Sequence, residues 1–190
     1  MEAKINIFFV DFDPKIAAQS LVDKHVVKMI LESCQLLSTA HRILDGTEFT
    51  EKKYVEGSFP ARYRNLKRWK LHDSRDNIIY QATHVNHPSA VWCRQSVENY
   101  NWLVDHFYAL MQEYTYRYNK QHKCYGELSY MLQSPPKNLE TYDMTLMPSA
   151  MADEYKISDD PIVNYRNYYK LGKTRMHSWK NRQPPEWISQ

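Results

Sequence analysis

Glycine is scarce in this chain of 190 residues, with only Gly46, Gly57, Gly126 and Gly172. No two of them stand close enough to build a phosphate-binding loop of the GxxxxGK or GxGxxG kind, which argues against a P-loop or dinucleotide-binding enzyme. A turn-rich β-sandwich would also need more glycine. The scarcity of glycine therefore favours a helical protein.

Cysteine pairs and long apolar runs are also missing. Cys34, Cys93 and Cys124 are odd in number and have no CxxC spacing, so a disulfide framework or thiolate zinc site is not expected and the thiols should be buried. No stretch approaches the ~20 consecutive apolar residues of a membrane span. The beginning of the chain lacks the pattern of a secretory signal. We expect an intracellular protein with no membrane partner.

Two short spacings could ligate a metal ion, but each has a structural alternative. His84 and His87 are separated by two residues, yet His87 precedes a helix-starting proline and is better explained as a capping residue. Asp11 and Asp13 form a DxD followed by proline, which is more typical of a turn. We therefore predict neither a metal site nor a cofactor.

Length and hydrophobic pattern together predict an all-α fold, namely a mainly helical single domain over residues 1–190 with at most one short N-terminal strand, at residues 5–10. Apolar residues recur at intervals of three and four over about residues 17–43 and along one long stretch that follows Pro88 and reaches Tyr118. Another helix is predicted from Pro161 to a terminating Gly172. Residues 46–57 and 134–150 are expected to be irregular connections.

The first predicted helix carries a narrow polar stripe, formed by His25, Lys28, Glu32, Gln35 and Thr39 at intervals of three and four. Because apolar residues flank the stripe on both sides, it is typical of the wall of a cleft. The alternative is an ordinary solvent-exposed face with some ion pairing. In a cleft, a carboxylate beside an amine could transfer protons or help the amine to attack a sugar carbon.

Cations and aromatic residues gather in three stretches, at residues 62–70, 117–123 and 173–182. Cations neutralise phosphates and aromatic rings stack on unpaired bases, so a nucleic acid is the expected partner of a chain whose net charge is only +3. The alternative is that these cations merely solvate helix ends. The residues predicted to contact DNA are Arg62, Arg64, Lys67, Arg68, Trp69, Lys70, His87, Arg94, Arg175, Lys180, Arg182 and Trp187.

Three parts of the chain resemble the phage pyrimidine-dimer DNA glycosylases of the endonuclease V family. They are Ile5-Asn6 together with the stretch LVDKHVV and the glutamate that follows it, the helix led by His87 and ending near Glu113 and Arg117, and the final Arg182–Trp187. The stretches DKHVVKM and HPSAVW also resemble a set of larger phage proteins. The resemblance implies an all-helical DNA repair enzyme with AP lyase activity, in the cytoplasm of an infected host cell.

The resemblance also implies a mechanism. In that family the glutamate seven residues after the histidine is catalytic, and Glu32 stands seven residues after His25. The family's nucleophile is the N-terminal α-amine, which attacks the sugar C1′ of an extruded pyrimidine nucleotide to form an imine. The amine here would be that of Met1 or of Lys28. The predicted catalytic residues are thus Glu32, Lys28, His25 and Met1.

The chain departs from the family pattern in several places. It begins Met1-Glu2, one residue longer than the pattern requires, and has Leu31 and Gln35 where the family has arginines. Two alternatives therefore stay open. One is a phage enzyme that hypermodifies DNA bases or processes modified nucleotides, and the other is a non-catalytic DNA-binding or host-inhibiting phage protein.

Overall fold

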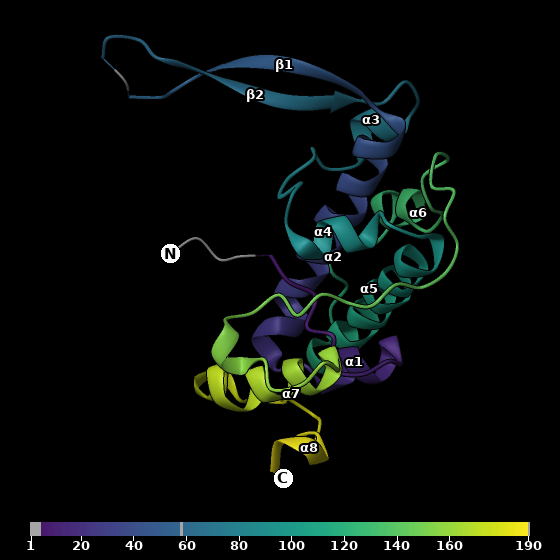
Figure 1. Ribbon diagram of the computed structural model, residues 1–190, viewed down its shortest axis with the longest axis vertical. Helices are drawn as coiled ribbons and strands as arrows, with labels where there is room; N and C mark the ends of the chain where they lie inside the picture. The colour runs from purple at the N-terminus through teal and green to yellow at the C-terminus, as the bar shows by residue number, and fades with distance from the viewer. Residues whose placement is uncertain (1–4, 58, 190) are drawn as a thin grey trace.

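The computed structural model describes residues 5–57 and 59–189 and is mainly helical (Figure 1). The helices are α1 (Pro14–Ser20), α2 (Asp23–Asp45), α3 (Arg75–Ile78), α4 (Pro88–Cys93), α5 (Val97–Tyr118), α6 (Glu127–Leu132), α7 (Pro161–Gly172) and α8 (Glu186–Ser189), with 3-10 turns η1 (Asp153–Tyr155) and η2 (Thr174–Met176). Strands β1 (Thr47–Tyr54) and β2 (Tyr63–Lys70) pair antiparallel. None of the described helices has both the length and the apolar character needed to cross a membrane.

The hairpin formed by β1 and β2 corrects the expectation of an all-α protein. Residues 46–57 were expected to form a loop, but most of them belong to β1. Residues 5–10, where a strand was expected if there was one, pair with no strand. Every residue of β1 is exposed, so the strand lacks the alternation of apolar and polar residues that marks a half-buried strand.

The helix predicted over residues 17–43 is divided in two. α1 ends at Ser20 and the chain is extended at Leu21 and Val22 before α2 begins. The predicted core side of α2 is confirmed, because Met29 and Leu37 are each no more than 1% exposed. The break places α1 against α5 while α2 packs on both α4 and α5.

The long helix predicted after Pro88 is also divided, into α4 and α5. The Ser96 hydroxyl accepts the backbone N–H of Asn99 at 3.1 Å and caps α5, while the Asn99 side chain donates to the carbonyl of Trp92 at 2.8 Å. These side chains bind backbone groups that a continuous helix would pair internally. Apolar periodicity alone did not reveal the break, since the stripe continues across it.

The core is one connected cluster of buried hydrophobic residues drawn from α1, α2, α4, α5 and α7. The three cysteines are free and buried in it, as predicted. Residues 5–10 are buried as well and run through this core. Residues 134–150 contain no helix or strand, which confirms the predicted irregular connection.

α7 begins as predicted but ends differently. The Asp160 side chain accepts the N–H of Ile162 at 2.8 Å and caps the helix before Pro161. Gly172 is the last helical residue and its φ is not positive, so it does not terminate the helix as a left-handed cap, the usual role of a glycine at a helix end. A side chain at this position would lie 2.7 Å from the ring of Tyr168. Close packing, not a turn, therefore explains this glycine.

Three buried histidines make the stability of the protein dependent on pH. Burial lowers the pKa of His25 to about 3, that of His41 to about 4 and that of His106 to about 4. In the unfolded chain each would titrate near pH 6.5. The unfolded state therefore binds protons that the folded state does not, and the stabilisation is complete above about pH 6.5 and is lost as the pH falls toward 4.

We accordingly expect the free energy of unfolding to be nearly constant from pH 7 to 8 and to fall steeply from pH 6 to 5. Between pH 6 and 5, His106→Gln should reduce the slope of the free energy of unfolding against pH by about 1.4 kcal/mol per pH unit, because one of the titrating groups is removed. Denaturant unfolding at several pH values measures the slope. The exposed His84→Gln is the matched control, and equal slopes for both variants would contradict the prediction.

Candidate active site

The carboxylate of Glu32 contacts both the side-chain amine of Lys28 and the backbone near the start of the described residues. Its Oε1 lies 2.8 Å from the Nζ of Lys28, one helical turn earlier on α2. Its Oε2 accepts the backbone N–H of Asn6 at 3.0 Å. Glu32 is only 7% exposed, whereas Lys28 is exposed. The polar stripe of α2 is therefore not an ordinary solvent-exposed face at this point.

Asn6 is held from several directions, so its position beside Glu32 is well defined. Its Oδ1 accepts the N–H of Ile7 at 2.8 Å and the hydroxyl of Tyr165 at 3.2 Å. Its Nδ2 donates to the carbonyl of Ala150 at 3.0 Å. Met1 lies outside the described residues.

His25 forms part of the interior beside this pair. Its Nδ1 lies 2.5 Å from the hydroxyl of Tyr169, and its ring stacks on Phe8 with 4.3 Å between ring centroids. Burial, and after it the charges of Lys173 and Lys28, lower the pKa of His25 to about 3. The imidazole is thus neutral at physiological pH. At 4% exposure it packs beneath the surface.

Phe8 has an unusual backbone conformation, with φ of 57°. A bulky residue in the left-handed region is strained and persists only where its surroundings fix it, which occurs often at functional sites. Here the Phe8 ring stacks on the imidazole of His25, and the Nζ of Lys173 lies 5.7 Å from the Phe8 ring centroid. The sequence marked Lys173 only as part of the basic stretch 173–182 and gave no sign of its contact with Phe8, because the two residues are distant along the chain.

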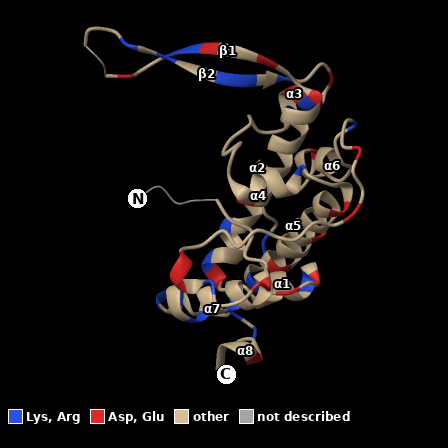
Figure 2. Ribbon diagram, in the orientation of Figure 1, with Lys and Arg blue, Asp and Glu red and all other residues tan. Residues whose placement is uncertain are grey.

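Six of the predicted DNA contacts lie together in the hairpin, in β2 or directly before it, where Lys and Arg are concentrated (Figure 2). Lys67 and Arg68 form ion pairs with Glu48 and Glu51 across the hairpin, at 3.0 and 2.8 Å. Trp69 is half-buried at the base. These residues therefore belong to one element, as their closeness in sequence suggested.

His87 and Arg94 stand at the two ends of α4. The Nδ1 of His87 accepts the N–H of Ser89 at 3.2 Å, which confirms the predicted cap. Arg94 is half-buried at the other end of α4. Its Nη1 has no hydrogen-bond partner among the residues that the structure describes, and burial lowers the pKa of its guanidinium. Among the described residues, no group of three or more His, Cys, Asp or Glu is arranged to hold a metal ion.

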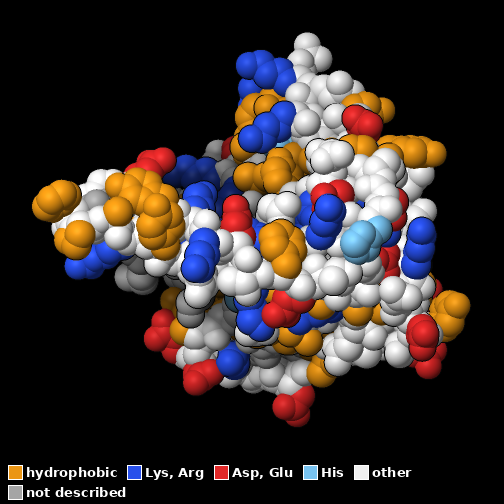
Figure 3. Space-filling view, turned by 90° about the horizontal axis from the view of Figure 1, so that it is seen from above, with side chains coloured by type: hydrophobic (Ala, Val, Ile, Leu, Met, Phe, Trp, Pro, Cys, Tyr) orange, Lys and Arg blue, Asp and Glu red, His pale blue; other side chains and the backbone are white. Residues whose placement is uncertain are grey.

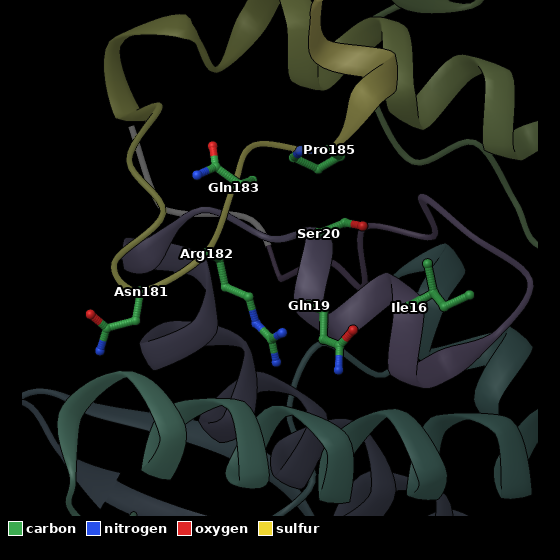
Figure 4. Close-up of a pocket in the computed structure, with 7 residues that line it drawn as sticks. All are labelled: Ile16, Gln19, Ser20, Asn181, Arg182, Gln183 and Pro185. Atoms are coloured by element: carbon green, nitrogen blue, oxygen red, sulfur yellow. The ribbon is translucent and has the colours of Figure 1, made fainter.

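The remaining predicted DNA contacts lie in the C-terminal tail, at the opposite end of the molecule from the hairpin (Figure 1). Arg175 is exposed, and the Nζ of Lys180 lies 5.3 Å from the ring centroid of Tyr118. Arg182 crosses a hollow of about 400 Å³, which it lines together with Gln19 and Asn181, toward α5 (Figure 4). There its guanidinium pairs with Glu113 at 2.9 Å.

Trp187 packs inward, near the guanidinium of Arg166 at 5.5 Å and the ring of Tyr169 at 6.0 Å. Arg117, from the second basic stretch, is only 1% exposed and does not lie on the surface. The structure thus separates two basic surfaces, the hairpin and the tail. α2, with Glu32, runs between the two ends of the molecule (Figure 1).

These features define a mainly helical protein with a carboxylate–amine pair beside the beginning of its chain. A family model described as pyrimidine dimer DNA glycosylase matches residues 5–126, and the chain belongs to this family. The matched range includes Asn6, Lys28 and Glu32 and ends before α7. No curated protein and no solved structure matches the chain.

Proposed function

We propose that the protein is a DNA repair enzyme, a glycosylase and AP lyase that extrudes a damaged pyrimidine nucleotide and attacks its sugar C1′ with an amine. The observation that carries the proposal is the Glu32 carboxylate, which is buried against both the Lys28 ammonium and the backbone N–H of Asn6. Membership of the pyrimidine dimer DNA glycosylase family supports a dimer or another damaged pyrimidine as the substrate.

In the proposed reaction, the lone pair of the amine forms a bond to C1′ and the bond from C1′ to the base breaks. The electrons of that bond pass to the base, which takes up a proton. Glu32 accepts a proton from the bound amine and passes it to the ring oxygen O4′. The bond between C1′ and O4′ then breaks as the nitrogen lone pair forms the second bond of the imine. Proton removal from C2′ expels the 3′ phosphate, and water hydrolyses the imine to release the sugar.

Two amines are candidates for the nucleophile. Lys28 has the contact, since its Nζ is 2.8 Å from Glu32. Met1 carries an N-terminal α-amine, the kind of group that the family uses, and the hydrogen bond from Asn6 to Glu32 brings the first described residues to the carboxylate. His25 is neutral and bonded to Tyr169, which supports a positioning role within the proposed site.

The two basic surfaces lie toward opposite ends of α2, which suits a duplex held along that helix, with the nucleotide extruded near Glu32. Extrusion costs a few kcal/mol and costs least for a damaged or mispaired base, so this step would itself favour lesions over normal nucleotides. The tail residues Arg175 and Lys180 are proposed to contact one flank of the duplex, and the residues of β2 the other.

Borohydride trapping tests the proposal and identifies the amine. Incubation with a duplex that contains a cyclobutane pyrimidine dimer should give a covalent adduct of protein and DNA, because borohydride reduces the imine to a stable secondary amine. Peptide mass spectrometry of the adduct should locate the sugar on Met1 or on Lys28.

Two controls make the trapping result decisive. Reductive methylation of the α-amine, checked by mass spectrometry, should prevent trapping only if Met1 is the nucleophile, and Lys28→Met should do so only if Lys28 is. The absence of an adduct with dimers, abasic sites and other pyrimidine lesions would overturn the lyase. Turnover that requires an activated pyrimidine and a small donor, seen by nucleoside mass spectrometry, would indicate a base-modifying transferase instead.

A further inference from the structure

The hairpin carries a marked excess of positive charge. Residues 47–70 contain seven Lys and Arg against three Asp and Glu, so their formal charge of +4 exceeds the +3 of the entire chain. The hairpin stands clear of the body, with cationic and hydrophobic side chains along it (Figure 3). This share of the positive charge is therefore concentrated on a projecting element, apart from the basic tail.

The strand register places most of this charge on one face. Residues directly opposite each other share a face, and Lys53 stands opposite Arg64, Phe49 opposite Arg68, and Thr47 opposite Lys70. The carboxylate of Glu51 lies on this face and pairs with Arg68. Within the described residues, no carboxylate forms an ion pair with Lys53, Arg64 or Lys70. Three cations of this face are thus available to a polyanion.

The base of the hairpin is fixed to the last turns of α2. Arg42, whose side chain is fully buried, donates to the carbonyl of Trp69 at 2.8 Å and to the carboxylate of Asp76 at 2.7 Å. At the junction between α2 and β1, a Cβ on Gly46 would lie 2.4 Å from the carbonyl oxygen of Arg42, so only glycine fits. The direction of the hairpin is therefore set relative to the helix that carries Glu32.

The distance between the two sites follows from helix geometry. Gly46 is fourteen residues beyond Glu32, which corresponds to about 21 Å along α2 at 1.5 Å per residue. That is the length of about six base pairs of duplex DNA. Strands of eight residues extend the hairpin by about 27 Å. Figure 1 shows it running sideways from the end of α2.

We propose that the hairpin is a DNA-binding arm that enters the major groove on one side of the extruded nucleotide, starting about six base pairs from it. The major groove admits a two-stranded ribbon, and the cationic face would neutralise the phosphates along its edges. The position of the arm relative to the nucleotide rests on the proposed function. Its affinity for duplex DNA does not.

Salt dependence of binding to an undamaged 30-base-pair duplex tests the arm. Binding weakens as salt rises, so the slope of log K against log salt is negative. The variant Lys53→Gln/Arg64→Gln/Lys70→Gln should reduce the magnitude of this slope by about 2.7, because each phosphate contact contributes about 0.9. The control Lys15→Gln/Lys137→Gln/Lys156→Gln removes the same charge from exposed positions on the body, outside all three basic stretches, and should leave the slope nearly unchanged. Equal slopes for the two variants would overturn the proposal.

A set of duplexes with an abasic analogue at a fixed position tests the one-sided reach. Lengthening one flank from about six to about fourteen base pairs should tighten binding of the natural protein, and lengthening the other flank by the same amount should not. The arm variant should show no gain on either side. Gains that are equal on both sides would overturn the placement. If borohydride traps no adduct with any lesion, the proposed glycosylase activity is overturned, whereas the salt dependence of duplex binding remains a valid test of the arm.

Discussion

Glu32→Gln is expected to lower the single-turnover rate of base release by about 10²–10⁴-fold, the usual contribution of a positioned proton-transfer group. The amide can still accept the backbone N–H of Asn6, so the local structure should persist. It cannot accept a proton from the attacking amine, and the ion pair with Lys28 is lost. Rapid quench with excess enzyme on a dimer-containing duplex measures the rate.

The matched control is Glu98→Gln, which makes the same change at an exposed position of α5. It should process the lesion at the natural rate. Duplex affinity should be nearly unchanged in both variants, because neither residue belongs to the proposed DNA-binding arm or tail. A Glu32→Gln protein that retains the natural rate would exclude this carboxylate from the chemistry.

Arg117→Met is expected to destabilise the protein by about 3–5 kcal/mol, as is usual when one partner of a buried ion pair is removed. The side chain of Arg117 is fully buried, and it bonds to Glu113 at 2.7 Å, to Asp23 at 2.9 Å and to the carbonyl of Leu21 at 2.9 Å. The substitution leaves these acceptors without the partner. The midpoint of thermal unfolding should fall by about 10 °C.

The exposed Arg175→Met is the control for the loss of a positive charge and should shift the unfolding midpoint little. A Glu113→Gln/Arg117→Met double variant should cost less than the sum of the two single variants, because the residues interact directly. Calorimetry of the natural protein, the two single variants and the double variant gives the double-mutant cycle that measures this interaction. A midpoint for Arg117→Met close to that of the natural protein would contradict a stabilising role.

The same ion pairs connect residues from two of the stretches that resemble the family. Glu113, Arg117 and Arg182 come from two of the three similar stretches, and here Glu113 pairs with both arginines. Asp23, at the start of α2, binds Arg117 and also accepts the backbone N–H of Lys180. These residues therefore hold the tail against α2 and α5. In this chain these residues serve packing, whereas Glu32 is the residue to which we assign the proposed chemistry.

The sequence by itself determined the features that depend on neighbouring residues. The apolar side of α2, the proline-led starts of α4 and α7, and the cap at His87 follow from helical periodicity and from local hydrogen bonds. The spacing of Lys28 and Glu32 likewise places both on one face of a helix. Such features need no knowledge of the rest of the chain.

Only the tertiary structure decided the features that join distant residues or lack a pattern. No residue of the two hairpin strands is fully buried, so no alternation of apolar and polar residues predicted them. The break at Ser96 interrupts a helical stripe of apolar residues that continues across it. Asn6 meets Glu32 across 26 residues, and Tyr169 meets His25 across 144. Contacts at such separations depend on how the helices pack. The hydrophobic effect has no direction, so many pairings of distant side chains would bury similar apolar area, and sequence spacing alone does not distinguish them.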